Sequence, residues 1–257
     1  MQKYIGDNNR KKIHSDVFPD TFRMLIVGPS SCGKTILLMK LLLEDGLLNY
    51  DKLFIFARSL YQHQYQCLRI GLENNLPKSD IIELINSTKL TKKHDASLDD
   101  IAKSISEINL EDEKEPSEIE CEFHETSDDI PDPCDVDRGI KNLIVFDDIM
   151  TDRKQNKPES YYTRGRSANC DCIYLAQNYT HLPLHTIRSN SNFMIFFKAS
   201  PMVVEQLYRN FSSVDMELKD WKQMCKTAWS KKYGYIVIDL SRDYESGNKY
   251  RFNIELN

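Results

Sequence analysis

Eight consecutive residues near the start of the chain have the types and spacing of a phosphate-binding loop. They are Gly28-Pro29-Ser30-Ser31-Cys32-Gly33-Lys34-Thr35, which fit the pattern G-x-x-x-x-G-K-[ST]. In such a loop, backbone N–H groups and a helix N-terminus surround a phosphate, because unpaired amides and the helix dipole favour an anion there. Lys34 can then reach the β- and γ-phosphates of ATP, and the Thr35 hydroxyl can hold Mg²⁺. We therefore expect all eight residues to bind the nucleotide.

Two carboxylates end a later apolar run, Leu143-Ile144-Val145-Phe146-Asp147-Asp148. A buried strand that ends in acidic residues, downstream of a phosphate loop, is a Walker B pattern. We expect Asp147 to hold Mg²⁺ together with Thr35, and Asp148 to orient or deprotonate the attacking water. Many ATPases carry a glutamate at the second position, and the aspartate here is one methylene shorter.

Gln177 follows another apolar run, Ile173-Tyr174-Leu175-Ala176. A polar residue at the tip of the strand after Walker B is placed to sense the γ-phosphate or the attacking water. An amide suits that role because it can both donate and accept a hydrogen bond. A capping or loop glutamine is the structural alternative.

Arginines are candidates for a residue that enters the site from a neighbouring subunit. Such a residue can neutralise the charge that develops on the transferred phosphoryl group. Arg164 and Arg166 lie between the Walker B run and the Gln177 strand, and Arg188 lies just beyond that strand. Arg209 is a weaker candidate. For each of them a surface ion pair is the ordinary explanation.

The elements that would position these residues alternate between strands and helices. The pattern predicts strands at 24–27, 52–57, 142–146, 172–175 and 193–197, helices at 36–43, 61–71, 201–210 and 215–225, and a closing hairpin of strands 235–240 and 250–254. This is an α/β P-loop NTPase with a mostly parallel sheet, helices on both faces and a C-terminal β-hairpin. If strand 52–57 inserts between the loop strand and the Walker B strand, the fold belongs to the RecA-like additional-strand division.

Composition divides the chain into an arm, a core and one insertion. Residues 1–20 are predicted to be a polar N-terminal arm, and 21–257 to be the ATPase domain. Within it, 92–140 is predicted to be an acidic, disordered insertion, since 111–138 carry 13 acidic residues against two basic ones. Such a segment buries too little apolar surface to offset its ordering entropy.

The remaining composition argues against several other classes. Seven cysteines without a repeating spacing do not form a disulfide framework. Cys121, His124 and Cys134 lack a proper fourth ligand, which argues against zinc. No apolar run approaches the roughly 20 residues that span a bilayer, and the first residues lack the apolar core of a signal peptide. We therefore expect a soluble intracellular protein without a membrane segment.

Taken together, four runs resemble the DNA-packaging ATPases of the FtsK–HerA superfamily. The resemblance is greatest to the poxvirus-type branch, which occurs in large DNA viruses, virophages and Polinton-like elements. The runs are G-P-S-S-C-G-K-T, L-I-V-F-D-D-I-M, Y-Y-T-R-G-R-S-A-N-C and I-Y-L-A-Q-N-Y-T-H-L-P-L-H-T-I-R-S-N-S-N. The third resembles a G-R-H-like element of some relatives, although Ser167 replaces the histidine.

The resemblance implies a homo-oligomeric ring around double-stranded DNA that hydrolyses ATP, with Mg²⁺, to drive a genome into a preformed capsid. Capsid or portal-region proteins would be its partners. It would act in the nucleus or cytoplasm of the host cell, or associated with the virion.

Other interpretations of the same motifs keep the fold but assign the protein a different activity. The chain could be an ATPase of virion assembly or export, although an export ATPase would be expected to carry a membrane segment. It could be helicase-like. A small-molecule kinase would need a lid with several arginines, and the glutamine strand argues against it. A non-hydrolysing scaffold would have no use for the pair Asp147 and Asp148.

Overall fold

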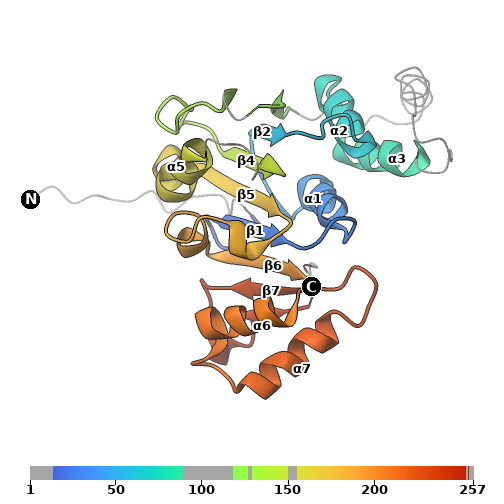
Figure 1. The fold of residues 1–257 in the computed structure, drawn as a ribbon. Coiled ribbons are helices and arrows are strands. Elements are labelled where there is room, and N and C mark those ends of the chain that lie inside the picture. Colours follow the sequence, from blue (N-terminus) through green and yellow to red (C-terminus); the bar gives the residue numbers. More distant parts are fainter. Residues whose placement is uncertain (1–13, 89–117, 127–128, 150–154, 253, 255–257) are drawn as a thin grey trace, which may run out of the picture.

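The computed structural model describes residues 14–88, 118–126, 129–149, 155–252 and 254. In this part of the chain, one sheet has the strand order β3-β2-β4-β5-β1-β6-β7-β8 (Figure 1). The first six strands in that order are parallel, and β7 and β8 continue the sheet in antiparallel pairing. The strands are β1 (Arg23–Val27), β2 (Lys52–Ala57), β3 (Glu120–His124), β4 (Asn142–Asp147), β5 (Cys170–Ala176), β6 (Phe193–Phe197), β7 (Tyr235–Asp239) and β8 (Tyr250–Arg251).

Helices cover both faces of this sheet (Figure 1). One face packs against α1 (Lys34–Leu43), α2 (His63–Glu73) and α3 (Lys78–Thr88), and the other against α5 (Asn156–Arg164), α6 (Pro201–Leu207) and α7 (Leu218–Ala228). Alternate residues of each central strand enter different cores: Met24 of β1 packs in the first and Leu25 in the second. A strand buried on both faces is apolar throughout, which is why these runs predicted a parallel sheet correctly.

The strand between the loop strand and the Walker B strand is β5. It pairs with β1 on one side and with β4 on the other, so that Tyr174 lies between Leu25 and Phe146. This order confirms the additional-strand division, although the strand that inserts is β5 and not 52–57, the candidate considered from the sequence. β2 pairs instead with the outer side of β4. All seven residues of β5 are buried, and only a central position covers both of its faces.

Part of the predicted acidic insertion is an ordered element of the sheet. β3 lies within 92–140 and pairs in parallel with β2. Lys52 of β2 offsets the acidic side chains there, since its Nζ lies 2.7 Å from Glu122 and 3.4 Å from Glu120. An edge strand also leaves its side chains partly in water, so a polar segment can pair without deep burial. The expectation of disorder is therefore wrong for this segment, while 92–117 and 127–128 lie outside the described residues.

The boundaries of the domain also differ from the prediction at its start. Residues 1–13 of the expected arm lie outside the described residues. From His14 onward the chain belongs to the domain, because His14 and Phe18 are buried. At the other end, β7 and β8 pair antiparallel, with Val237 opposite Arg251, which confirms the C-terminal hairpin.

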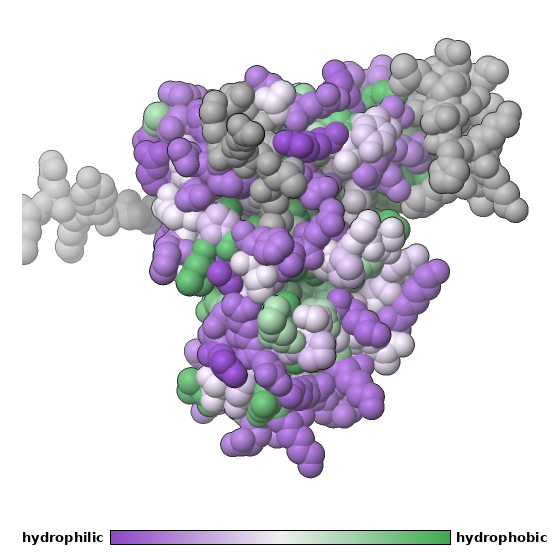
Figure 2. All heavy atoms as spheres, in the orientation of Figure 1, coloured by the Kyte–Doolittle hydropathy of each residue, from purple (hydrophilic) through white to green (hydrophobic). Residues whose placement is uncertain are grey.

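The surface drawn in Figure 2 is largely hydrophilic, with small separated hydrophobic areas. None of the helices in the described segments is long and apolar enough to cross a membrane.

Candidate nucleotide-binding site

The loop Gly28–Thr35 connects the carboxyl end of β1 to the start of α1. Two of its residues have left-handed backbone conformations, Ser31 with φ 60° and Gly33 with φ 106°. A Cβ added to Gly28 would lie 2.6 Å from both Cys32 Sγ and Phe197 Cβ, so this position accepts no side chain. Gly33 therefore serves a left-handed turn and Gly28 a close approach of side chains, and a tight curl of successive residues can direct backbone N–H groups at an anion.

Lys34 reaches back across this loop. Its Nζ donates hydrogen bonds to the backbone oxygens of Gly28 at 2.7 Å and Pro29 at 2.9 Å. The ammonium group is thus held at the loop, where a phosphate would have a positive partner. Cys32 is half-buried in the same loop, and burial raises the pKa of its thiol, which disfavours a thiolate there.

Asp147 is the last residue of β4, and it is almost entirely buried, with 8% of its surface exposed. Its Oδ2 accepts a hydrogen bond of 2.5 Å from the hydroxyl of Tyr65 on α2. Burial raises the pKa of Asp147, the Tyr65 hydrogen bond lowers it, and the charge of Asp148 raises it again. Burial prevails because few groups replace the water that a carboxylate loses.

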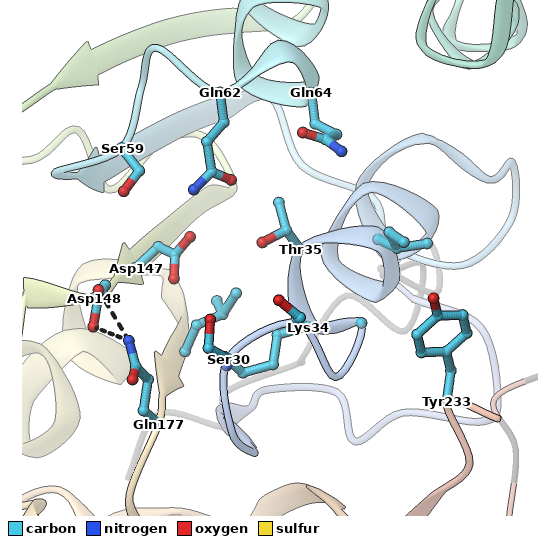
Figure 3. Close-up of a pocket in the computed structure, with 14 residues that line it drawn as sticks. Ser30, Lys34, Thr35, Ser59, Gln62, Gln64, Asp147, Asp148, Gln177 and Tyr233 are labelled. Atoms are coloured by element: carbon cyan, nitrogen blue, oxygen red, sulfur yellow. Dashed lines mark hydrogen bonds between the residues drawn. The ribbon is translucent and has the colours of Figure 1, made fainter. Parts of the chain in front are cut away.

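Asp148 and Gln177 meet at the carboxyl edge of the sheet. β4 and β5 are adjacent, with Asp147 opposite Leu175, so the residues that follow the two strands are neighbours. Gln177 Nε2 lies 3.2 Å from each carboxylate oxygen of Asp148 and donates to both (Figure 3). Asp148 adopts a left-handed conformation, φ 54°. A non-glycine residue at positive φ often marks a functional site, where the surrounding structure offsets the strain.

A cavity of about 440 Å³ joins the loop to these three side chains. Its size is in the range of small-molecule sites. Figure 3 shows Asp147, Asp148 and Gln177 at one end of it, with Lys34 and Thr35 beside them. Its lining also includes polar side chains from the segment after β2, which are Ser59, Gln62 and Gln64, and an aromatic ring from the segment before β7, which is Tyr233.

Sequence reasoning did not single out these additional residues. Ser59 and Gln62 follow the carboxyl end of β2, and parallel strands end at the same edge of the sheet, so this rule could have identified them. Tyr65 and Tyr233 gave no such signal, because one lies inside a helix and the other in a loop far along the chain.

The residues present fit a nucleotide with Mg²⁺. Thr35 and Asp147 both line the cavity, and hydroxyl and carboxylate oxygens are the ligands that Mg²⁺ prefers. Lys34 Nζ, held at the loop, supplies a positive charge that a phosphate could bind.

None of the four candidate arginines is among the described lining residues of this cavity. Arg164 ends α5, and its Nη2 lies 3.7 Å from Asp132. Arg166 is exposed on the short turn that leads into β5. Both therefore lie near the amino ends of the strands, at the edge opposite the phosphate loop. Arg188 lies in a short helical turn before β6, and its guanidinium is 5.0 Å from the centre of the ring of Tyr179, which follows the carboxyl end of β5. From the opposite edge, Arg164 and Arg166 could complete a hydrolytic site only in a neighbouring subunit.

The sheet order, the phosphate loop and the carboxylates at its edge define a P-loop NTPase of the additional-strand division. A family model described as "Poxvirus A32 protein" matches residues 115–248, just over half of the chain. The chain belongs to this family, which confirms the resemblance to the poxvirus-type branch of the FtsK–HerA superfamily. The match includes Asp147, Asp148 and Gln177, and it begins after the phosphate loop.

Several solved structures are similar over most of the chain. The genome packaging NTPase B204 from Sulfolobus turreted icosahedral virus 2, in complex with ATP-gammaS, is 10% identical, with 92% of this chain and 98% of that one covered and a TM-score of 0.49. VirB4 of Thermoanaerobacter pseudethanolicus is also 10% identical, with 86% of this chain and 87% of that one covered and a TM-score of 0.45. No curated protein sequence matches the chain significantly. The P-loop class rests on the strand order and loop geometry described above, independently of these similarities.

Proposed function

We propose that the chain is an ATP-hydrolysing motor that translocates double-stranded DNA into a viral capsid. The observation that carries the hydrolytic part is the contact of Gln177 with both oxygens of Asp148, beside the phosphate loop and in one cavity with it. Membership of the poxvirus A32 family supports a role in genome packaging. The B204 structures, whose descriptions name a genome packaging NTPase with bound ATP-gammaS or AMPPCP, concern that protein and agree with this proposal.

The side chains of the cavity have separate tasks in this proposal. Lys34 and the loop backbone bind the β- and γ-phosphates. Thr35 and Asp147 hold Mg²⁺, which would neutralise charge on the phosphate oxygens. Asp148 accepts a proton from the attacking water, and Gln177 orients that carboxylate and senses the γ-phosphate. An arginine of a neighbouring subunit, from among Arg164, Arg166 and Arg188, stabilises the charge that develops during transfer.

The proposed role for a neighbouring subunit's arginine would require the chain to assemble into a ring. No arginine lines the described part of the cavity, so a subunit that hydrolyses ATP efficiently would need a neighbour. A ring also offers one central channel for double-stranded DNA, and capsid or portal-region proteins would hold it at the site of packaging.

ATP hydrolysis with and without double-stranded DNA tests this proposal, with Lys34→Ala as the blank. We expect DNA to stimulate phosphate release, and Lys34→Ala to abolish it. Stimulation by single-stranded DNA alone would favour a helicase-like role, while turnover that ignores DNA would favour virion assembly or export. Transfer of phosphate to an added nucleoside would identify a kinase. Each of these three results would reject the packaging motor and retain the P-loop fold.

A further inference from the structure

The loop between α7 and β7 brings one aromatic side chain to the nucleotide cavity. Tyr233 lines that cavity, and half of its surface is exposed. Its ring lies against the phosphate loop: a Cβ added to Gly33 would be 3.3 Å from Tyr233 Cδ1 and 3.5 Å from Cγ. The contact joins two segments that lie about 200 residues apart in the sequence.

The backbone of Tyr233 is held in an uncommon conformation, with φ 63°. The neighbouring Gly234 would be the usual residue for a left-handed position, but it is needed elsewhere. A Cβ on Gly234 would lie 2.1 Å from the backbone oxygen of Ala228, so the glycine permits a close approach to the end of α7. The left-handed turn therefore falls on the tyrosine. A bulky residue at positive φ is unusual, and such strain is concentrated at ligand sites.

The cavity has two distinct ends, as Figure 3 shows. Asp147, Asp148 and Gln177 lie at one end, and Tyr233 lies at the other, beyond the loop and the start of α1. In the proposed mechanism Asp148 and Gln177 act on the water that attacks the γ-phosphate. A nucleotide bound by Lys34 would therefore have its γ-phosphate at the end of the cavity that holds these two residues. The nucleoside then extends toward the opposite end, where Tyr233 and the half-exposed Ile36 offer an aromatic and an aliphatic surface.

We propose that Tyr233 is the stacking platform for the base of the bound nucleoside triphosphate. This inference rests on the proposed nucleotide site and assigns its base-binding end. A nucleobase is a flat aromatic ring, and stacking on an aromatic side chain stabilises it whichever base it is. Lys232 Nζ lies 4.9 Å from the centre of the Tyr233 ring. Lys232 is exposed, so its ammonium group can leave the ring when a base stacks there.

Calorimetric titration of the full chain with two magnesium-saturated ligands tests the platform. One ligand is ATP, and the other is inorganic tripolyphosphate, which has the phosphates but neither ribose nor base. We expect Tyr233→Ala to weaken ATP binding about tenfold, the loss expected for one stacked base, and to leave tripolyphosphate binding within about twofold. Tyr233→Trp keeps an aromatic surface and should retain ATP affinity.

Tyr244→Ala is the matched control. Tyr244 is also an exposed tyrosine, 44% exposed, but it lies in the turn Tyr244–Ser246 between β7 and β8, at the edge of the sheet opposite the cavity. We expect this variant to bind both ligands as the unchanged protein does. Melting temperatures of all variants confirm that each one is folded.

Two results would overturn the platform. Unchanged ATP affinity in Tyr233→Ala would mean that no base stacks there, and equal weakening of both ligands would mean that the ring only supports the phosphate loop. In either case the nucleotide site itself stands, provided that Lys34→Ala weakens both ligands. If Lys34→Ala changes neither, the proposed function fails and the platform with it.

Discussion

Gln177 donates its side-chain amide to both carboxylate oxygens of Asp148, each 3.2 Å from Nε2. The two residues are separated by 29 positions in the sequence, and adjacent strands bring them together. The contact fixes the orientation of a carboxylate whose backbone is itself in a left-handed conformation. It also connects the residue that we propose senses the γ-phosphate to the group that we propose accepts the proton of the attacking water.

Gln177→Glu should therefore impair hydrolysis more than binding. A glutamate cannot donate to Asp148 and would set a second negative charge beside it. We expect ATP turnover to fall about 100-fold, the lower end of what general acid–base groups contribute, while the dissociation constant for ATP changes little. Phosphate release and ATP titration measure the two effects. Gln223→Glu, at an exposed position of α7, is the control, and near-normal turnover in Gln177→Glu would contradict the role.

The buried Asp147 should make the protein less stable than its amide variant. Burial raises the pKa of this carboxyl above its ordinary value of about 4. At pH values between the ordinary and the raised pKa, Asp147 is protonated in the folded state but not in the unfolded state. Stability therefore falls as pH rises through this window, and the cost of the buried charge persists above it.

Asp147→Asn removes that charge and leaves an oxygen to accept the Tyr65 hydrogen bond. We expect it to raise the free energy of unfolding by about 1 kcal/mol at pH 7.5 and to abolish hydrolysis. This increase in the free energy of unfolding should become smaller as pH falls toward 4, because Asp147 itself is then protonated. Urea unfolding at several pH values measures it, with the exposed Asp243→Asn for comparison. A loss of stability at pH 7.5 would show that burial does not dominate.

Asp171 is the centre of a buried polar cluster at the amino edge of the sheet. Its Oδ2 lies 2.7 Å from both His14 Nε2 and Lys141 Nζ, and its Oδ1 accepts from the backbone N–H of Phe22 at 3.0 Å. Asp171→Asn would leave the buried Lys141 cation without its counter-charge. We expect a loss of about 3 kcal/mol or more, as for other broken buried pairs.

Urea unfolding of this variant can be compared with the breaking of an exposed pair. Lys40 and Glu44 lie 3.5 Å apart on the surface of α1, and Lys40→Ala should cost no more than about 0.5 kcal/mol. Equal losses in the two variants would mean that the cluster around Asp171 contributes little.

Gly71 lies within α2, where intrinsic propensity alone would favour alanine by about 1 kcal/mol. The structure reverses this expectation, because a Cβ there would lie 2.5 Å from Cγ1 of Ile81 on α3. We expect Gly71→Ala to be destabilising by about 1–2 kcal/mol through overpacking. A double-mutant cycle with Ile81→Ala tests the cause: the second change should cost less in the Gly71→Ala background. Additive effects would exclude the clash.

The sequence by itself determined the local features of this protein. A phosphate loop needs eight consecutive residues, and these carry their glycines, Lys34 and Thr35 wherever the loop lies in space. Apolar runs identified the central strands, and the polar residues that follow them, Asp147, Asp148 and Gln177, reach one edge because parallel strands share their direction.

Only the tertiary structure decided which distant segments meet. The extra central strand is β5, but β4 and β6 are buried at every position as well, so local patterns do not reveal the lateral order of the strands. β3 is ordered despite its charge, because Lys52 and an edge position compensate for it. Tyr65 contacts Asp147 across 82 positions of sequence, and Tyr233 lies against Gly33 across about 200 positions. Such contacts depend on how whole helices and loops pack on the sheet, and no short stretch of sequence records that packing.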